Sequence, residues 1–379
     1  MYTSIETQLK TLLETIGLAG DIIFSKPPKS DMGDYAFACF ELAKKDGVNP
    51  AEYAKVLAEK IQSAAHPLIQ EAKAFGPYVN FFLHAQEVAR LVLETIAEQG
   101  DTYGSHTIGK GQTYLFEFAH PNTHKAFHIG HLRNIITGES LSRIFENAGY
   151  LIHRVNYQGD VGMHIAKCLW AIQELHDEFV LVQKGTLDEK IAFLGKAYAY
   201  GSQSFEERPE VQEAVKQYNA NIYTNREAVE PIYSETRAWS LSYFDRIYAR
   251  VGTQFERFYF ESEVFARGKE LVEEYLTKGI FQKSDGAVIF PGSQYGLHDR
   301  VFLNSQGFPT YEGKEVGLAE LQFSDYTADR IVHITGSEQA PYFSVVFKAI
   351  EQVFPHTSNK EKHVTYGWVR LKEGKMSSR

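Results

Sequence analysis

One short stretch, residues 115–134, limits what this chain can fold into. Its sequence, LFEFAHPNTHKAFHIGHLRN, begins with an apolar run that is typical of a buried parallel strand, and Pro121 ends that run. From His128 onward, apolar residues recur at helical spacing, and this pattern stops at Gly149. The stretch therefore predicts a strand that turns into a helix.

The amino end of the predicted helix suits a phosphate group. Free backbone N–H groups and the helix dipole favour an anion at such a position. Gly130 would allow a ligand to approach closely, because a side chain there would stand in its way. His128 and His131 could donate hydrogen bonds to a phosphoryl oxygen as charge builds on it during displacement.

A metal site is the alternative interpretation of the same stretch. His120, His124, His128 and His131 are spaced by four, four and three residues, so on one continuous helix they would share a metal-binding face. The proline and the glycine that stand among them argue against a continuous helix. We therefore expect no protein-bound metal.

Composition narrows the class of protein. A length of 379 residues indicates two or three domains, and a mean hydropathy of -0.31 is that of a soluble protein. No stretch approaches the roughly 18 apolar residues that span a bilayer. The N-terminus is an amphipathic helix rather than a signal peptide, and Cys39 and Cys168 form no disulfide framework, so we expect a cytoplasmic protein. A net charge of -9 weighs against indiscriminate polyanion binding but permits a local basic patch.

The chain divides into two predicted domains. Residues 1–105 predict a small N-terminal α+β domain, and a polar, glycine-rich linker at residues 100–111 follows it. On sequence alone, this domain could be a cap without chemistry. Its predicted elements are helices at residues 5–16, 51–65 and 86–99 and a strand within residues 74–83.

Residues 106–379 predict an α/β domain with a Rossmann-type parallel sheet. A second strand at residues 151–157 completes a βαβ unit with the central turn. A mainly helical insertion at about 175–285 follows, and strands return in GAVIF, RVFLN and RIVHIT. The last of these ends in the sequence GSEQ. Since ligands gather at the carboxyl ends of parallel strands, Gln339 should lie beside the histidine turn.

The C-terminal sequence KMSSR, residues 375–379, combines cations and hydroxyl groups. By itself it is typical of a solvated basic tail. After a sheet that binds a nucleotide, the same groups could hold the phosphates and release pyrophosphate.

These motifs together carry a family resemblance. HIGH at residues 128–131 matches the signature of class I aminoacyl-tRNA synthetases, and KMSSR resembles their KMSKS loop. The flanking sequences PNTHK, LRN, GDVG and GSEQ resemble those of arginyl-tRNA synthetases, as do GDYAF and VNFFL near the N-terminus. The resemblance covers the whole chain.

The resemblance implies an arginine–tRNA ligase. Such enzymes activate L-arginine with ATP and Mg²⁺ to arginyl adenylate and transfer arginine to tRNA(Arg), and most need bound tRNA for the first step. It also implies that the N-terminal domain contacts the tRNA elbow. We expect a monomer whose partners are tRNA(Arg), L-arginine and ATP, without a membrane.

The resemblance assigns roles to three sets of residues. The catalytic set is His128, His131, Lys125 and Lys375. The ATP-binding set is His128, Gly130, His131, Lys375, Met376, Ser377 and Ser378. The arginine-binding set is Glu117, Asn122, Tyr311, Glu315 and Gln339. Carboxylates in the last set suit the planar, cationic guanidinium group.

Two positions depart from the family pattern. The family more often has aspartate where Glu315 stands, so this side chain is one methylene longer. Ser378 occupies the place of the second lysine of KMSKS, and Lys125 is predicted to supply the missing charge to the ATP phosphates.

The family continues beyond this motif into a helical bundle that reads the anticodon. We therefore expect a truncated form without the anticodon-binding domain, which binds arginine and ATP but charges tRNA poorly. Two alternatives stay open. A small-molecule nucleotidyltransferase could share HIGH but would not need the insertion, and a non-catalytic tRNA-binding paralogue would not need His128, His131 and Lys375.

Overall fold

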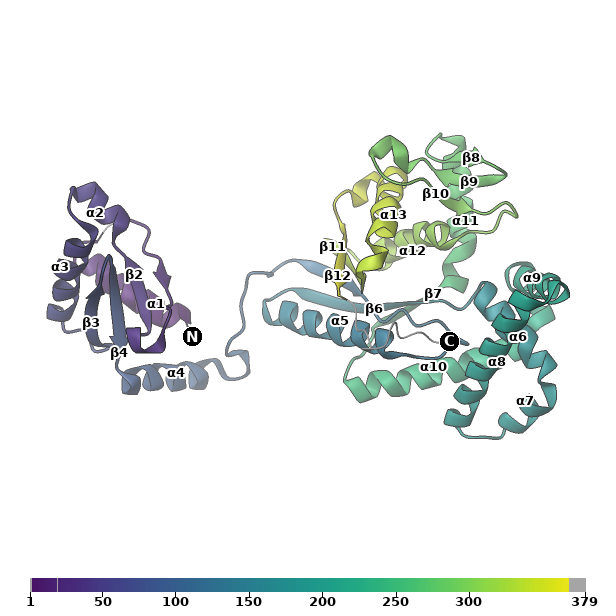
Figure 1. Ribbon diagram of the computed structural model, residues 1–379, viewed down its shortest axis with the longest axis horizontal. Coiled ribbons are helices and arrows are strands. Elements are labelled where there is room, and N and C mark those ends of the chain that lie inside the picture. Colours follow the sequence, from purple (N-terminus) through teal and green to yellow (C-terminus); the bar gives the residue numbers. More distant parts are fainter. Residues whose placement is uncertain (1, 19, 368–379) are drawn as a thin grey trace. The chain divides into compact units, whose positions relative to one another are not determined.

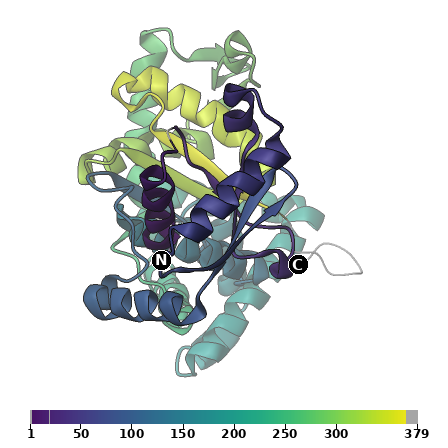
Figure 2. The same cartoon turned by 90° about the vertical axis from the view of Figure 1, so that its left-hand side faces the viewer.

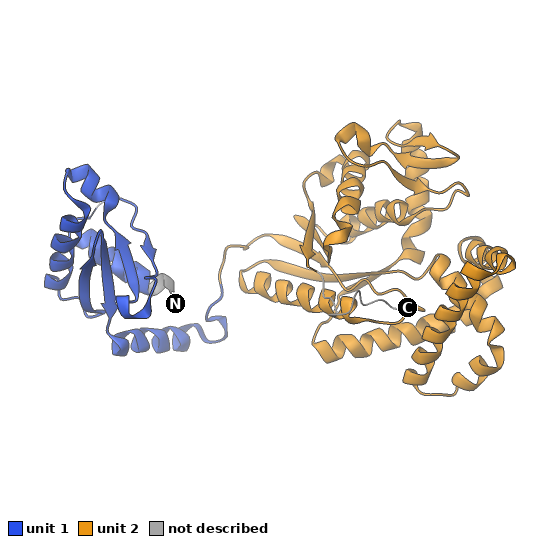
Figure 3. Cartoon of the chain, viewed as in Figure 1, with its two compact units in different colours: residues 1–105 blue, residues 106–379 orange. Residues whose placement is uncertain are grey.

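The computed structural model describes residues 2–18 and 20–367. The chain splits into two compact units, Met1–Ser105 and His106–Arg379, which Figure 3 shows in different colours. The division falls inside the polar, glycine-rich segment at residues 100–111. Among the described helices, none combines the length and the apolar character needed to cross a membrane.

The N-terminal unit is an antiparallel sheet packed against helices, as Figures 1 and 2 show. Its strand order is β1-β2-β4-β3. Leu9 and Leu13 of one helix meet Leu57 and Ile61 of another over Phe81 of the sheet. The elements are α1 Tyr2–Thr15, β1 Phe24–Ser25, β2 Tyr35–Ala38, α2 Phe40–Asp46, α3 Pro50–Ser63, β3 Ile69–Phe75, β4 Tyr78–Leu83 and α4 Ala85–Gln99, with short 3₁₀ turns at Ser30–Met32 and Gly100–Thr102.

The predicted helices of this unit match α1, α3 and α4, and the strand predicted within residues 74–83 is β4. This strand pairs antiparallel with β3 in a hairpin, and the strand β3 was not predicted. Gly76 and Pro77 form the two-residue turn, and Gly76 has a φ of 56°.

The second unit is built on a five-stranded parallel sheet with the order β12-β11-β5-β6-β7. In chain order this is a doubly wound arrangement that starts at the centre and reverses direction between β5 and β11. The predicted Rossmann-type sheet is therefore confirmed. Its strands are β5 Thr113–Glu117, β6 Leu151–Gln158, β7 Arg257–Phe260, β11 Arg330–Gly336 and β12 Glu361–Tyr366.

Helices cover both faces of this sheet (Figure 1). Successive residues of β5 point to opposite faces, so Phe116 packs with Ile135 and Leu115 packs with Leu318. The first core joins the sheet to α5 and α10, and the second joins it to α11 and α12. These helices and the last one are α5 Ile129–Asn147, α10 Ile232–Val251, α11 Glu261–Thr277, α12 Tyr311–Asp325 and α13 Ala340–Val353.

The insertion between β6 and β7 is helical and has its own apolar core, in which Leu169, Phe193 and Val215 are buried. The range predicted for it, about 175–285, also includes β7, which is an edge strand of the parallel sheet. The sequence RFYF of β7 is short and is followed directly by a helix, so no turn residue marks it. Besides α10, the insertion contains α6 Met163–Glu174, α7 His176–Val182, α8 Leu187–Glu207, α9 Pro209–Thr224 and a 3₁₀ turn at Arg226–Val229.

The strands GAVIF and RVFLN do not join the parallel sheet. They belong to a small antiparallel sheet with the order β10-β9-β8, which lies between α11 and α12 in the sequence. The strands are β8 Gln282–Ser284, β9 Ala287–Phe290 and β10 Arg300–Leu303, and the remaining 3₁₀ turns are Gly292–Tyr295, Ser337–Gln339 and Pro355–Thr357.

Candidate active site

A cavity of about 770 Å³ lies at the carboxyl ends of β5 and β11, where the strand order reverses. Among the residues that line it are those of the predicted arginine-binding set, Glu117, Asn122, Tyr311, Glu315 and Gln339. His128, Gly130 and His131 line the same cavity. The fold thus brings together side chains that are up to about two hundred residues apart in the chain, as expected at a topological switch point.

Two histidines cap the amino end of α5. The Nδ1 atom of His128 accepts a hydrogen bond from the N–H of Gly130 at 3.0 Å, and the Nδ1 atom of His131 accepts one from the N–H of His128 at 3.3 Å. The two rings stack, with 4.0 Å between their centroids. A neutral imidazole that accepts at Nδ1 carries its proton on Nε2, so each ring retains one N–H donor for a ligand.

Both rings are held in the neutral form. Burial lowers the pKa of His131 to about 3, and the charge that protonation would place on His128 and the charge of Lys125 act in the same direction. Burial and the charge of Lys125 also lower the pKa of His128. At neutral pH the pair therefore offers hydrogen-bond donors without a net charge.

The turn differs from the sequence-based interpretation in two details. A Cβ atom on Gly130 would lie 2.8 Å from Cε1 of His128, so glycine is needed here for the position of that ring. The first N–H groups of the helix are also not all free. The N–H of Gly130 donates to the ring of His128, and the N–H of His131 donates to the carbonyl oxygen of His128 at 3.0 Å. The ring Nε2–H groups replace part of the backbone as donors.

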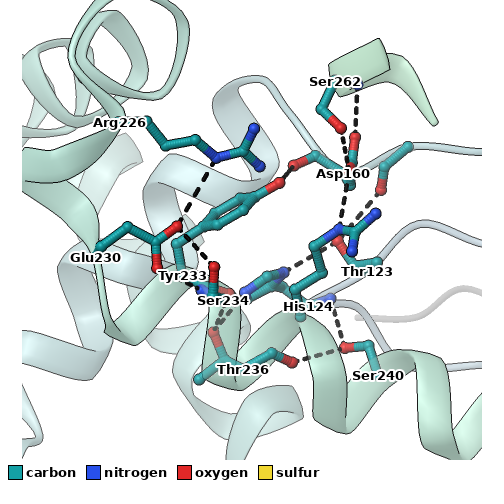
Figure 4. Close-up of polar contacts among 12 residues, drawn as sticks. Thr123, His124, Asp160, Arg226, Glu230, Tyr233, Ser234, Thr236, Ser240 and Ser262 are labelled. Carbon is teal, nitrogen blue, oxygen red and sulfur yellow. Dashed lines mark hydrogen bonds and ion pairs between the residues drawn. The ribbon is translucent and has the colours of Figure 1, made fainter.

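The loop before Lys125 is fixed by the helical insertion (Figure 4). His124 is fully buried, and its N–H donates to Ser240 Oγ at 3.0 Å. Its Nε2 atom lies 2.6 Å from Oγ1 of Thr236 on α10, and its Nδ1 atom lies 3.0 Å from Oγ1 of Thr123. Burial lowers the pKa of His124 to about 3. The imidazole is therefore a neutral link between this loop and α10.

Asp160 joins the same region to two helices (Figure 4). Its carboxylate accepts hydrogen bonds from Nε of Arg237 at 2.9 Å and from the N–H and Oγ of Ser262 at 2.8 and 2.7 Å. Its carbonyl oxygen accepts from the hydroxyl of Tyr233 at 2.8 Å. The GDVG sequence is thus a structural junction between β6, α10 and the start of α11.

These contacts contradict the metal-binding alternative. Helix α5 begins at Ile129, and His120 and His124 have φ values of 47° and 59°, which lie outside the helical region. His124 faces α10 and does not share a face with His128 and His131. Within residues 2–18 and 20–367, no group of three His, Cys, Asp or Glu side chains is placed to hold a metal ion.

The opposite part of the cavity is built from carboxylates. Glu117 is the last residue of β5 and is 1% exposed. It accepts hydrogen bonds from Nε2 of Gln322 at 2.5 Å and from Nδ1 of His333 at 3.0 Å. The Nε2 atom of His333 lies 2.6 Å from Oε2 of Glu361 on β12. The ring of His333 is therefore held between two buried carboxyl groups.

Burial and neighbouring charges have opposite effects on the pKa values of His333 and Glu117. Burial alone would lower the pKa of His333, but the charges of Glu117 and Glu361 raise it well above its ordinary value. Burial would likewise raise the pKa of Glu117, whereas the charge and hydrogen bond of His333 hold it below its ordinary value. The raised pKa of His333 and the lowered pKa of Glu117 both indicate a charged imidazolium beside an ionised carboxylate.

Glu315, in the first turns of α12, is in a different state. It is buried, and the hydroxyl of Tyr342 lies 3.3 Å from its Oε1 atom. Burial, with the negative charge of Glu117, raises the pKa of Glu315 to about 8. In the free protein at pH 7, this carboxyl group is therefore mostly protonated. Tyr311, at the start of the same helix, is 58% exposed.

The amide side chains of the predicted set lie at the ends of the two central strands. Asn122 forms a parallel bridge with Gly159, and a Cβ atom on Gly159 would lie 2.0 Å from Oδ1 of Asn122. Glycine at this position is therefore required by the amide. Gln339 ends the short 3₁₀ turn that follows β11.

Lys125 is not among the residues that line the cavity, and its Nζ atom lies 5.6 Å from the ring centroid of Tyr198 on α8. Its charge nonetheless acts on both ring histidines of the turn. The remaining predicted residues, Lys375, Met376, Ser377 and Ser378, lie outside the described residues.

Sequence reasoning missed several residues of the site. Glu261 lines the cavity and forms a buried ion pair with Lys314, with 2.8 Å between Oε2 and Nζ. It begins α11 directly after β7. Had the RFYF sequence been recognised as a strand, an acidic residue at its carboxyl end would have been a candidate. His333 interrupts the apolar run of β11 and Glu361 begins β12, but neither position shows in the sequence that the two side chains meet beside Glu117.

Comparison with known families places these features in context. The family model described as "tRNA synthetases class I (R), catalytic domain" matches residues 92–379. The model described as "Arginyl tRNA synthetase N terminal domain" matches residues 3–83.

Curated relatives and solved structures agree with these matches. The chain is 32% identical to the arginine–tRNA ligase of Treponema denticola over 367 residues, which covers 96% of this chain and 62% of the relative. It is 29% identical to that of Clostridium acetobutylicum, with 94% and 62% covered. The fold matches Thermus thermophilus arginyl-tRNA synthetase with a TM-score of 0.66 at 21% identity, covering 100% of this chain and 67% of that one. The chain spans about 62% of the length of the curated relatives it matches.

Proposed function

Because the chain belongs to the arginyl-tRNA synthetase family of class I, we propose that it binds L-arginine and ATP in the cavity and joins them as arginyl adenylate. It then passes arginine to tRNA(Arg). The observation that carries this proposal is the composition of one cavity, which combines a pair of neutral histidines at a helix amino end with buried carboxyl groups.

The carboxyl groups suit the guanidinium group of arginine. This group is a planar cation with five N–H donors, and a carboxylate can accept two of them at once. Glu315 is a buried acceptor in this cavity, and the hydroxyl of Tyr342 contacts its Oε1 atom at 3.3 Å. Asn122, Gln339 and Tyr311 supply neutral polar groups for the rest of the amino acid.

The histidine turn suits the phosphate chemistry. In the first step a carboxylate oxygen of arginine attacks the α-phosphorus of ATP, the bond to the bridging oxygen breaks, and pyrophosphate leaves with the electron pair. The attacking carboxylate is already ionised, so no general base is needed. The Nε2–H groups of His128 and His131 donate to phosphate oxygens as negative charge shifts during the displacement.

Cations complete the phosphate site. MgATP is the substrate form, and the magnesium ion arrives with the nucleotide rather than from a protein site. Lys125 and Lys375 neutralise the departing pyrophosphate, with Lys125 acting in place of the lysine that Ser378 replaces.

We assign contact with the tRNA to the N-terminal unit. Lys26, Lys29, Lys44 and Lys45 are exposed on it and can contact the phosphate backbone of the tRNA elbow. A cytoplasmic location follows from this role in translation.

One assay tests the proposed function against its alternatives. ATP–pyrophosphate exchange is measured with each amino acid, in the presence and absence of tRNA(Arg). We expect exchange with arginine and with no other amino acid, and we expect tRNA(Arg) to increase its rate. Exchange with another carboxylic acid and no tRNA effect would indicate a small-molecule nucleotidyltransferase. Tight tRNA binding without any exchange would indicate a non-catalytic paralogue.

A further inference from the structure

His333 is a buried, charged group that the proposed reaction does not use. It lies on β11, next to the central strand of the sheet, and is 2% exposed. It does not line the cavity, but its hydrogen-bond partner Glu117 does. Phe343 and Phe347 of α13 pack against the ring, each with 5.1 Å between ring centroids. The imidazole is thus held in one orientation behind the carboxylate end of the cavity.

The contacts of the ring fix the number of protons that His333, Glu117 and Glu361 hold together. Nδ1 lies 3.0 Å from Oε1 of Glu117, and Nε2 lies 2.6 Å from Oε2 of Glu361. Ionised carboxylates only accept hydrogen bonds, so both contacts require a proton on each ring nitrogen. A neutral ring could donate to one of them only, and the other carboxyl group would then have to carry the proton. The two arrangements hold the same number of protons, but only in the first does the ring carry a positive charge.

The other titratable groups around His333 leave the positive charge on its ring. His120 approaches Glu117 with 3.7 Å between Nδ1 and Oε1, but burial lowers its pKa and keeps it neutral. On β12, burial and the charge of His333 lower the pKa of His363 to about 4, and its Nε2 atom contacts the hydroxyl of Thr335 at 2.7 Å. The third group is Glu315, whose carboxyl is mostly protonated at pH 7.

We propose that His333 is a positioning residue that sets the preference of the cavity for a cationic side chain. As an imidazolium between Glu117 and Glu361, it keeps Glu117 ionised and fixed at the cavity wall. Glu117 then stays a carboxylate over the whole neutral range, and Glu315 remains as the carboxyl group that meets the charge of the ligand. The identity of the ligand, an amino acid with a guanidinium group, rests on the proposed function.

Removing the positive charge of His333 should cause Glu117 to take up a proton. His333→Gln keeps a hydrogen-bond donor but leaves Glu117 and Glu361 buried without a cation. Burial then raises the pKa of Glu117, so this carboxylate takes up a proton near neutral pH. A protonated Glu117 no longer attracts a cation. It also no longer raises the pKa of Glu315, but we expect the lost attraction to outweigh the easier ionisation of Glu315, so that arginine binding weakens. Raising the pH removes this proton and restores part of the binding.

A matched control is available on the neighbouring strand. His363 also packs against Phe343, with 4.5 Å between ring centroids, but its polar contact is a hydroxyl and not a carboxylate. His363→Gln therefore changes a histidine of the same sheet without changing the charge between Glu117 and Glu361.

The affinity for arginine is measured by calorimetry at pH 6.5 and 8.5 for the full chain and both variants. We expect His333→Gln to bind arginine at least about tenfold more weakly than the parent at pH 6.5, the size of one charge-assisted contact, with a smaller ratio at pH 8.5. His363→Gln should stay within about twofold at both values, since it removes no charge-assisted contact. A ratio for His333→Gln that is within twofold, or that does not change with pH, would overturn the proposal.

Nitrogen NMR of histidine-labelled parent chain tests the inference without any ligand. The His333 signal, assigned by its absence in His333→Gln or in a second variant, His333→Asn, should show two protonated ring nitrogens at neutral pH. Ring nitrogens that titrate near the ordinary histidine value, or a neutral ring at pH 7, would refute it. A parent chain that binds no arginine would contradict the proposed function, while the NMR result would still decide the protonation state of His333.

Discussion

Two histidines, His131 in the cavity wall and His333 behind the carboxylate end, have opposite protonation states. At the helix end, His131 is desolvated beside the positive charge of Lys125, and its pKa falls to about 3. At the carboxylate end, His333 is desolvated between Glu117 and Glu361, and its pKa rises well above the ordinary value. Burial lowers the pKa in both places, so the sign of the neighbouring charges decides the outcome.

This difference divides the cavity into two functional halves. Neutral Nε2–H donors can approach the phosphates of ATP without forming a fixed ion pair, so the contact can strengthen as charge shifts in the transition state. A charged His333 instead holds Glu117 as a carboxylate, which a cationic amino acid requires. The predictions below separate the halves by testing whether catalysis and arginine binding respond to different residues.

The largest effect is expected at the helix end. His131→Ala removes one Nε2–H donor, and we expect the rate of arginine-dependent ATP–pyrophosphate exchange, assayed with tRNA(Arg), to fall about 100- to 1,000-fold. The affinity for arginine should stay within about twofold, because the affected group contacts phosphate and no charge-assisted arginine contact is lost. A comparable loss of arginine affinity would show that the two halves are not separate.

The converse experiment is Glu315→Gln at the carboxylate end. This variant keeps the size and the hydrogen-bonding ability of the side chain but cannot ionise. We expect the affinity for arginine to fall about 100-fold, the upper range for a charge-assisted contact. Calorimetry measures the loss, and unchanged affinity would exclude Glu315 as the guanidinium acceptor.

Replacing Lys125 should have a smaller effect, and it should change the exchange rate through the contact with the ATP phosphates. Lys125→Ala should lower the exchange rate about tenfold, since one charge-assisted contact to phosphate is lost. Lys125→Arg keeps the charge and serves as the matched control. Exchange within twofold of the parent for the alanine variant would refute the idea that Lys125 compensates for Ser378.

The smallest effect is on stability, and it depends on pH. The raised pKa of Glu315, about 8 against a usual 4.5, means that the folded state holds this proton more tightly than the unfolded state. Its contribution to stability is present below about pH 4.5 and is lost as the pH rises toward 8. Urea denaturation should therefore show that Glu315→Gln gains stability relative to the parent between pH 5 and pH 9. A constant difference would mean that Glu315 is already ionised in the free protein.

The sequence predicts the framework of the site well, because local patterns define it. Helix α5, the strands β5 and β11 and the HIGH turn all follow from apolar spacing and from one proline and one glycine. The strand β7 was not predicted, since it has only four residues and α11 begins directly after it. The strand β3 was not predicted either, although its hairpin partner β4 lies within the predicted range 74–83.

The electrostatics of the site could not be predicted in the same way. Glu117 was identified as a candidate, but its partners Gln322, His333 and Glu361 come from three other elements and are more than 200 residues away. Protonation depends on which charges the fold brings within hydrogen-bonding distance, and a single sequence does not show those distances. The neutral state of His131 and the charged state of His333 therefore emerge only from the structure.

The most direct test of the account compares arginine with citrulline, its uncharged analogue, by calorimetry at pH 7 in two buffers of different ionisation enthalpy. We expect arginine to bind about 10- to 150-fold more tightly, the range for a charge-assisted contact, and to release about one proton as Glu315 ionises. Equal affinities for the two ligands, with no proton release, would contradict the claim that this end of the cavity selects a cation.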